Sequence, residues 1–216
     1  GETIMTAVLS VRDLAVALPP GADRELAVEH ISFDVSAGEI VCLLGESGSG
    51  KSVISFAVMG LLPDNVRVSA GEIRLGDTNL LALTPAQLRE LRGDEIAMIF
   101  QEPMTALNPV MTCGEQLDEL LAEHTSLRGR ERKAKILAMF DAVKLPEPER
   151  IFASYPHQLS GGQRQRIMIA MALILEPKLL IADEPTTALD VTTQAEVLSL
   201  IRTLQREGGT AVLFIT

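Results

Sequence analysis

A glycine-rich segment with a single lysine holds the residues best suited to chemistry. Residues 45–52 (Gly-Glu-Ser-Gly-Ser-Gly-Lys-Ser) fit the pattern G-x-x-x-x-G-K-[ST] of a phosphate-binding loop. Glycines let the backbone curl so that successive N–H groups point at phosphate oxygens. Lys51 is expected to reach the β- and γ-phosphates of a nucleotide, and the Ser52 hydroxyl is expected to bind Mg²⁺. The expected phosphate-binding residues are Gly45, Glu46, Ser47, Gly48, Ser49, Gly50, Lys51 and Ser52.

The alternative interpretation of this segment is a flexible glycine turn with a solvated lysine. Its surroundings argue against that. The apolar residues 40–44 predict a buried parallel strand before the loop, and residues 52–62 predict a helix after it that is ended by Pro63. A phosphate-binding loop needs this order of strand, loop and helix, because the helix N-terminus adds its positive dipole end to the site.

Two carboxylates follow another apolar run and are the candidate catalytic pair. Residues 179–182 (Leu-Leu-Ile-Ala) predict a buried strand, and Asp183 and Glu184 come directly after it. Two acids in this position are by themselves most often a solvated turn or a helix cap. With a phosphate loop in the same chain, we expect Asp183 to hold Mg²⁺ and Glu184 to act as the general base that polarises the attacking water.

A serine and two glycines precede the helical run 164–175 and form a possible second anion site. Residues 159–163 are Leu-Ser-Gly-Gly-Gln. Ser160 could simply be the N-cap of the helix, with the two glycines in a turn. That interpretation explains the helix start but not both glycines beside a serine hydroxyl. Bare N–H groups at a helix N-terminus bind anions, so two such sites in one chain indicate two halves of a composite site.

The elements that must position these residues alternate between strand and helix. Further apolar runs at 178–182 and 211–215 predict strands, and residues 192–206 predict the helix between them. This alternation predicts an α/β fold with a mostly parallel sheet covered on both faces. Residues 6–37 and 65–78 instead predict a flanking antiparallel sheet, and residues 102–158 predict a helical insert, with amphipathic segments at 115–124 and 130–143.

Composition narrows the possible partners. The chain has 216 residues, 47% of them apolar, and a formal net charge of −10. An acidic surface repels phosphate backbones, so we expect no nucleic-acid partner. No apolar stretch reaches the ~18–20 residues that a bilayer span needs. The two cysteines and three histidines lack the spacing of metal ligands.

On these features the chain resembles the ATP-binding-cassette family, and the resemblance covers nearly its whole length. Five features stand in the order that the family has. They are residues 45–52, Gln101 after the apolar residues 97–100, residues 159–163, the pair Asp183 and Glu184, and residues 188–190 (Ala-Leu-Asp).

The resemblance implies an ATPase with a P-loop NTPase (RecA-like) core, and ATP and Mg²⁺ as ligands. The core and antiparallel subdomain would comprise residues 6–101 and 159–216, with a helical subdomain at 102–158. Two such domains would face each other head to tail. Each ATP would be held between the phosphate loop of one domain and the signature, residues 159–163, of the other. Gln101 would contact Mg²⁺ and the attacking water. By the same resemblance, Ser160, Gly161 and Gly162 would bind the γ-phosphate of the partner's ATP. Gln163 and Asp190 would also belong to the nucleotide site, with Asp190 at the dimer seam.

A narrower resemblance concerns the ATPases of oligopeptide and dipeptide importers. It is carried by residues 100–109 (Phe-Gln-Glu-Pro-Met-Thr-Ala-Leu-Asn-Pro), by the loop 45–52 and by residues 183–190. It implies an importer subunit for peptides or similar small solutes. Such a subunit would lie at the cytoplasmic face of the inner (plasma) membrane as a peripheral protein and would push on transmembrane permease subunits through the helical insert.

Two departures from the family pattern matter for the chemistry. Where the family often has an aromatic residue stacked on adenine, this chain has Leu18. The family also has a histidine after its last core strand, and this chain ends at Thr216, where that histidine would follow. We therefore expect a fragment that binds nucleotide but turns ATP over slowly.

Two alternatives to a transport ATPase stay open. One is a non-transport cassette protein of DNA repair, translation or cluster assembly, which the absence of sustained heptads between Gln101 and Leu159 and the acidic charge disfavour. The other is a module that binds nucleotide without efficient turnover.

Overall fold

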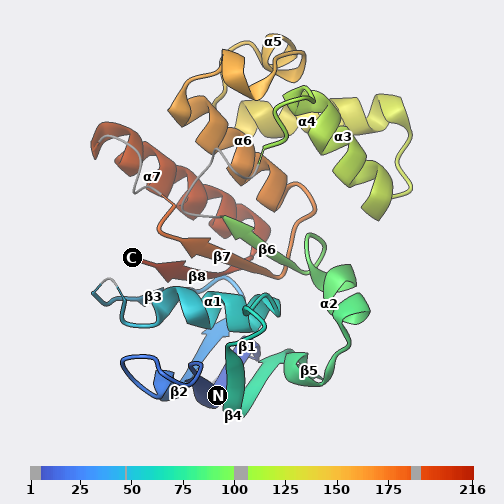
Figure 1. Cartoon of the computed structure of the whole chain (residues 1–216). Helices are drawn as coiled ribbons and strands as arrows, with labels where there is room; N and C mark the ends of the chain where they lie inside the picture. The colour runs from blue at the N-terminus through green and yellow to red at the C-terminus, as the bar shows by residue number, and fades with distance from the viewer. Residues whose placement is uncertain (1–5, 47, 100–106, 186–190) are drawn as a thin grey trace, which may run out of the picture.

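The computed structural model of the chain describes residues 6–46, 48–99, 107–185 and 191–216 (Figure 1). The strands are β1 (Ala7–Ala17), β2 (Leu26–Ser36), β3 (Ile40–Leu43), β4 (Arg67–Leu75), β5 (Thr78–Asn79), β6 (Ile96–Ile99), β7 (Leu179–Asp183) and β8 (Ala211–Ile215). The α-helices are α1 (Lys51–Met59), α2 (Pro85–Leu91), α3 (Cys113–His124), α4 (Gly129–Ala142), α5 (Pro148–Phe152), α6 (Gly161–Leu173) and α7 (Val191–Gly208).

A parallel sheet in the order β3-β8-β7-β6 forms the centre of the molecule. Helix α1 covers one face of the sheet, and α6 and α7 cover the other (Figure 1). Strand β7 is buried along its whole length, because its side chains alternate between two apolar cores. Leu180 packs toward α6 and α7, whereas Leu179 and Ile181 pack toward α1. The expected α/β architecture with a parallel sheet is confirmed.

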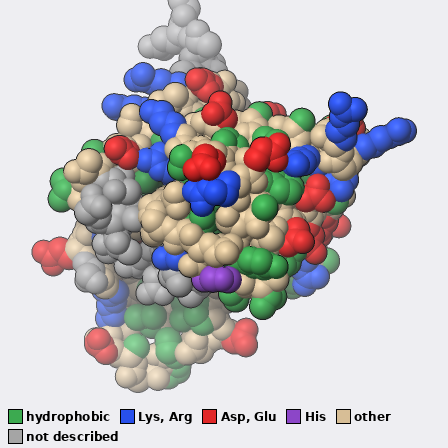
Figure 2. All heavy atoms as spheres, turned by 90° about the horizontal axis from the view of Figure 1, so that it is seen from above, with side chains coloured by type: hydrophobic (Ala, Val, Ile, Leu, Met, Phe, Trp, Pro, Cys, Tyr) green, Lys and Arg blue, Asp and Glu red, His purple; other side chains and the backbone are tan. Residues whose placement is uncertain are grey.

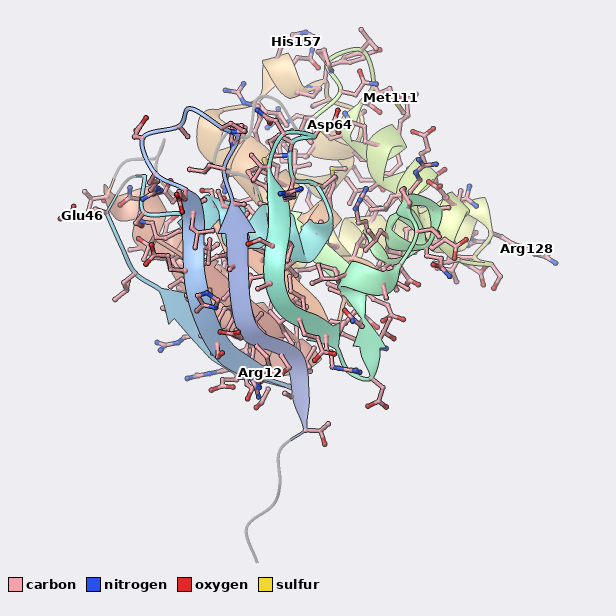
Figure 3. The ribbon with its side chains drawn as sticks, turned by 60° about the horizontal axis from the view of Figure 1, so that its bottom comes forward. Arg12, Glu46, Asp64, Met111, Arg128 and His157 are labelled. Carbon is pink, nitrogen blue, oxygen red and sulfur yellow. The ribbon has the colours of Figure 1, made fainter. Side chains whose placement is uncertain are left out.

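The expected antiparallel sheet is also present, in the order β2-β1-β4-β5. Its inner face packs into the apolar core that also contains residues of α1, together with Leu179 and Ile181. Leu9, Val11 and Ile73 of this sheet are fully buried there. Figure 3 looks onto this sheet, with Arg12 among the side chains of its outer face. The long strand β1 pairs with β2 on one side and with β4 on the other, and β2 contacts α1 and β8 of the other layer.

Helices α3 and α4 pack on α6, α5 packs on α3 and α4, and the three helices form a separate layer (Figure 1). The amphipathic segments expected at 115–124 and 130–143 are the bulk of α3 and α4. Thr112 and Glu115 form a capping box that starts α3, and Arg132 of α4 makes an ion pair with Asp118 of α3, 2.7 Å between Nε and Oδ1. Figure 2, which looks down on this layer, shows acidic and basic side chains interspersed with exposed apolar ones.

Two local expectations are wrong. The strand before the phosphate loop is parallel, as expected, but it is not buried: Ile40 is 36% exposed, and Cys42 is exposed. The reason is that β3 stands at the end of the strand order among the described strands, so it pairs with β8 alone. Helix α1 ends earlier than Pro63, because Gly60 adopts a φ of 67° and its N–H caps the carbonyls of the last turn.

Among the described residues, no helix is sufficiently long and apolar to cross a membrane.

Candidate functional site: a phosphate-loop cleft

The phosphate loop links β3 to α1, and close backbone packing explains its last glycine. Gly50 is the N-cap of α1 with a φ of 91°. A Cβ atom at this position would lie 2.2 Å from the carbonyl oxygen of Ala27, so no other residue fits without moving the backbone. The end of the loop therefore lies against β2, and the loop leads directly into the N-terminus of α1. Ser47 lies outside the described residues, and Glu46 is exposed at the edge of the molecule (Figure 3).

The ammonium group of Lys51 lies over the loop. Its Nζ donates to the carbonyl oxygen of Gly45 and, at 2.8 Å, to that of Thr216 at the end of β8. Gly45 leaves room for this, because a Cβ atom there would lie 3.2 Å from Cδ of Lys51. The single cation of the loop is therefore oriented by backbone carbonyls, which a phosphate oxygen could replace as acceptors of a charge-assisted hydrogen bond.

Ser52 and Asp183 face each other across the first turn of α1 and the end of β7. The Ser52 hydroxyl donates to Oδ1 of Asp183 at 3.4 Å. Burial raises the pKa of Asp183, an effect that the hydrogen bond from Ser52 partly opposes. Among the described residues there is no group of three His, Cys, Asp or Glu side chains that could hold a metal. A hydroxyl and a carboxylate side by side nevertheless fit Mg²⁺, which commonly takes few protein oxygens and completes its shell with substrate phosphates and water.

Glu184 follows in an unusual backbone conformation. Its φ is 44°, in the left-handed region that a residue before proline rarely adopts. Its N–H donates to the carbonyl oxygen of Ile215 at 2.8 Å, which fixes the preceding peptide plane. The residue is partly exposed and lines the same cleft as Lys51 and Ser52. The strained turn thus places Glu184 in the wall of the cleft that the phosphate loop also lines.

This cleft, of about 340 Å³, is lined by four residues of the phosphate loop and by Glu184, together with residues that the sequence did not indicate. Its wall includes Leu18, as the family resemblance implied. It also includes Arg24, whose Nη2 donates to the carbonyl oxygen of Gly48 at 2.7 Å. Sequence analysis missed Arg24 because an arginine in the turn between two strands has no motif of its own. The described residues that line the cleft are Leu18, Arg24, Ala27, Gly48, Gly50, Lys51, Ser52, Val53 and Glu184.

The signature residues form a second, separate feature. Ser160 is the N-cap of α6: its hydroxyl accepts the N–H of Gln163 at 3.2 Å, and the Gln163 side chain accepts the N–H of Ser160 at 3.1 Å. Ser160 is exposed, and a Cβ atom on Gly161 would have no neighbour within 4 Å. Among the described residues that line the phosphate-loop cleft, none belongs to the signature. The expected residues Gln101 and Asp190 lie outside the described residues.

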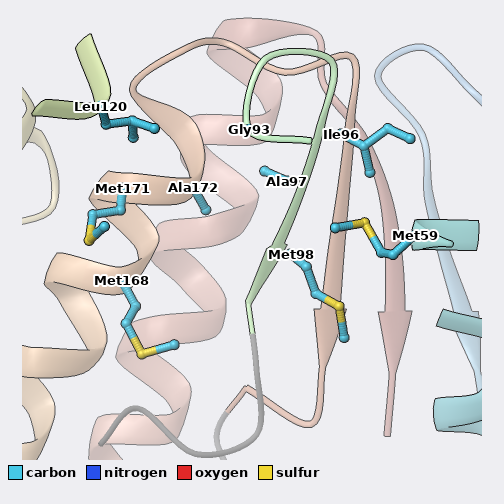
Figure 4. A pocket seen from close by; sticks show the side chains of 9 residues that line it. All are labelled: Met59, Gly93, Ile96, Ala97, Met98, Leu120, Met168, Met171 and Ala172. Atoms are coloured by element: carbon cyan, nitrogen blue, oxygen red, sulfur yellow. The ribbon is translucent and has the colours of Figure 1, made fainter. Parts of the chain in front are cut away.

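A second cleft, of about 230 Å³, lies along β6 and is almost entirely apolar (Figure 4). Side chains of α3 and α6 form one wall, with Leu120, Met168 and Met171, and Met59 of α1 and Met98 of β6 lie opposite. Four of the residues that line it are methionines, whose unbranched side chains adapt to irregular partners.

Comparison with known proteins agrees with this geometry. The family model described as ABC transporter matches residues 28–187. Over its full length, the chain is 50% identical to the peptidoglycan transport ATP-binding protein YejF of Agrobacterium fabrum, and it covers 40% of that protein. It is 49% identical to the oligopeptide transport ATP-binding protein OppD of Escherichia coli, over 97% of this chain and 62% of the relative. The chain therefore spans less than two thirds of the length of these relatives.

Solved structures give the same result. The dimeric, post-hydrolysis structure of the ATP-binding cassette MJ0796 bound to ADP and Pi superposes with a TM-score of 0.82 at 29% identity. The match covers 96% of this chain and 87% of that chain. The fold is that of the ATP-binding cassettes, and the chain belongs to the ABC transporter family.

Proposed function

We propose that the chain is the ATP-binding and ATP-hydrolysing part of an ABC importer for peptides or similar small solutes. The single observation that carries the ATPase proposal is the cleft that gathers Lys51, Ser52 and Glu184, with Asp183 beside Ser52. The printed names of the relatives, which include oligopeptide and peptidoglycan transport, support the class of solute.

In this proposal the residues divide the work of hydrolysis. The loop N–H groups and Lys51 bind the phosphates of ATP. Ser52 and Asp183 would hold Mg²⁺, which would supply positive charge against the phosphate oxygens. Glu184 accepts the proton of the attacking water. Gln101 would orient that water and contact Mg²⁺.

The site would be completed by a second cassette. The signature residues lie at the N-terminus of α6, outside the cleft of their own chain, where the positive end of the helix dipole favours an anion. Facing a second copy head to tail, Ser160, Gly161, Gly162 and Gln163 would bind the γ-phosphate held by the partner, with Asp190 at the seam. Support comes from the dimeric structure of the similar cassette MJ0796.

The helical layer would transmit the motion to permease subunits at the cytoplasmic face of the membrane. We assign residues 102–158 to this subdomain and residues 6–101 and 159–216 to the nucleotide-binding core with its antiparallel sheet. The methionine-lined cleft between α6, α3 and β6 (Figure 4) offers the adaptable apolar surface that a permease segment could cover.

Two variants of the full-length protein that carries this chain test the ATPase proposal. Glu184→Gln leaves the nucleotide contacts in place but has no basic carboxylate, so we expect it to accumulate as an ATP-bound dimer in size-exclusion chromatography with Mg-ATP. Lys51→Ala is expected to weaken ATP binding in calorimetry, because a charge is lost from the phosphate site. Hydrolysis by Glu184→Gln at the wild-type rate, or unchanged ATP affinity in Lys51→Ala, would contradict the assignment.

A further inference from the structure

A buried glutamine connects the signature helix to the segment that follows the catalytic carboxylates. Gln165 lies in α6, five residues beyond Ser160, and its side chain is fully buried. Its Nε2 donates to the carbonyl oxygen of Pro185. Its Oε1 has no partner among the described residues. A buried amide is costly unless it is hydrogen-bonded, so the bond to Pro185 is the polar contact that the structure gives this side chain.

The position of Pro185 makes this bond consequential. Pro185 directly follows Glu184, and two hydrogen bonds enclose this dipeptide. The N–H of Glu184 donates to Ile215 and fixes the peptide plane before it, whereas Gln165 fixes the peptide plane after Pro185. The proline ring itself sets its φ near −65°. Little rotational freedom is therefore left for the backbone torsions of Glu184, from which its side chain projects.

The backbone of Glu184 needs such support. A φ of 44° in a non-glycine residue that precedes proline is unfavourable and persists only where the surroundings hold it. Strand β8 supplies one restraint and α6 supplies the other. We propose that Gln165 is a positioning residue, which holds the strained turn that aims Glu184 and ties it to the signature helix. This inference rests on the proposed ATPase function.

Gln165→Met tests it, because methionine keeps the length of the side chain but has no N–H donor. Gln205 is a matched control: it is also a buried glutamine, 3% exposed, in α7, and its Nε2 has no partner among the described residues. Both variants of the full-length protein would be assayed for kcat and KM of ATP hydrolysis, for nucleotide affinity with a fluorescent ATP analogue, and for thermal unfolding.

We expect Gln165→Met to lower kcat about 10- to 100-fold, since small misplacements of a reacting group have effects of this size. Nucleotide affinity should change less than about twofold, because Gln165 does not line the cleft, and Gln205→Met should keep kcat within about twofold. Equal kcat values for the two variants would overturn the inference, as would a loss of kcat in Gln165→Met that merely parallels a loss of nucleotide affinity.

Two further measurements keep the test decisive. If Gln165→Met does not fold, Gln165→Glu replaces it: a neutral buried carboxyl can donate to Pro185 and an ionised one cannot, so its kcat relative to wild type should rise as the pH falls. A pH-independent ratio would contradict the role of the donor.

The Glu184→Gln variant separates the two proposals. If wild type hydrolyses ATP and Glu184→Gln does not, an active Gln165→Met overturns the positioning role alone, whereas an inactive wild type overturns both.

Discussion

Replacing Gly50 by alanine should be among the most damaging single-methyl additions in this chain. Two effects act together there. A non-glycine residue at a φ of 91° costs about 1–2 kcal/mol. The new Cβ would also lie 2.2 Å from the carbonyl oxygen of Ala27. Both atoms belong to backbone or are rigidly attached to it, so no side-chain rotation relieves the overlap, and the shift of the loop or of β2 adds about 1–3 kcal/mol.

The sum, about 2–5 kcal/mol, is a large share of the ~5–15 kcal/mol that stabilises a typical domain. For a chain of this size it corresponds to a fall of roughly 5–20 °C in the melting temperature. Nucleotide binding should weaken as well, because the loop that presents its N–H groups to phosphate must move.

Gly21→Ala is the matched control for Gly50→Ala. Gly21 has a φ of 92°, but a Cβ atom there would have no neighbour within 4 Å. It therefore isolates the conformational term, about 1–2 kcal/mol, and the difference between the two variants measures the overlap with Ala27. Urea or thermal unfolding by circular dichroism gives both values. A Gly50→Ala variant that is no less stable than Gly21→Ala would refute the packing argument.

Two further predictions concern the phosphate-loop cleft and Asp183, the carboxylate beside Ser52. Leu18 offers dispersion contacts but no aromatic stacking, so GTP should bind within about tenfold of ATP, a gap of roughly 1.4 kcal/mol, and Leu18→Tyr should tighten ATP in calorimetry. A strong preference of the wild type for ATP would mean that another residue recognises the base. Asp183→Asn should raise the melting temperature at pH 7 without Mg²⁺, because burial raises the pKa of Asp183 and disfavours its ionised form in the folded state. The stabilising contribution of this carboxyl is present below its unfolded pKa, near 3.8, and is lost as the pH rises through the folded value, so the advantage of asparagine should shrink in acid. A less stable Asp183→Asn variant at pH 7 would contradict this reasoning.

Local sequence patterns determined most of the architecture and the outline of the site. Strict apolar runs such as residues 211–215 predicted strands that the structure contains, because a strand buried on both faces has few alternatives. The glycines and the lysine of residues 45–52 predict a phosphate-binding loop, because their roles depend on backbone geometry within these eight residues. The same holds for Ser160, whose capping role is set by residues three positions away.

Only the tertiary structure decided the burial of a strand and the contacts between residues far apart in the sequence, because both depend on which elements become neighbours. The strand before the phosphate loop is as apolar as the others, yet it is partly exposed because it stands at the end of the strand order. Neither the approach of Ala27 to Gly50 nor that of Arg24 to Gly48 follows from spacing, since the partners belong to elements more than twenty residues apart. The bond from Gln165 to Pro185 is of the same kind: a glutamine inside a helix has no distinguishing pattern until the fold brings a backbone carbonyl to it.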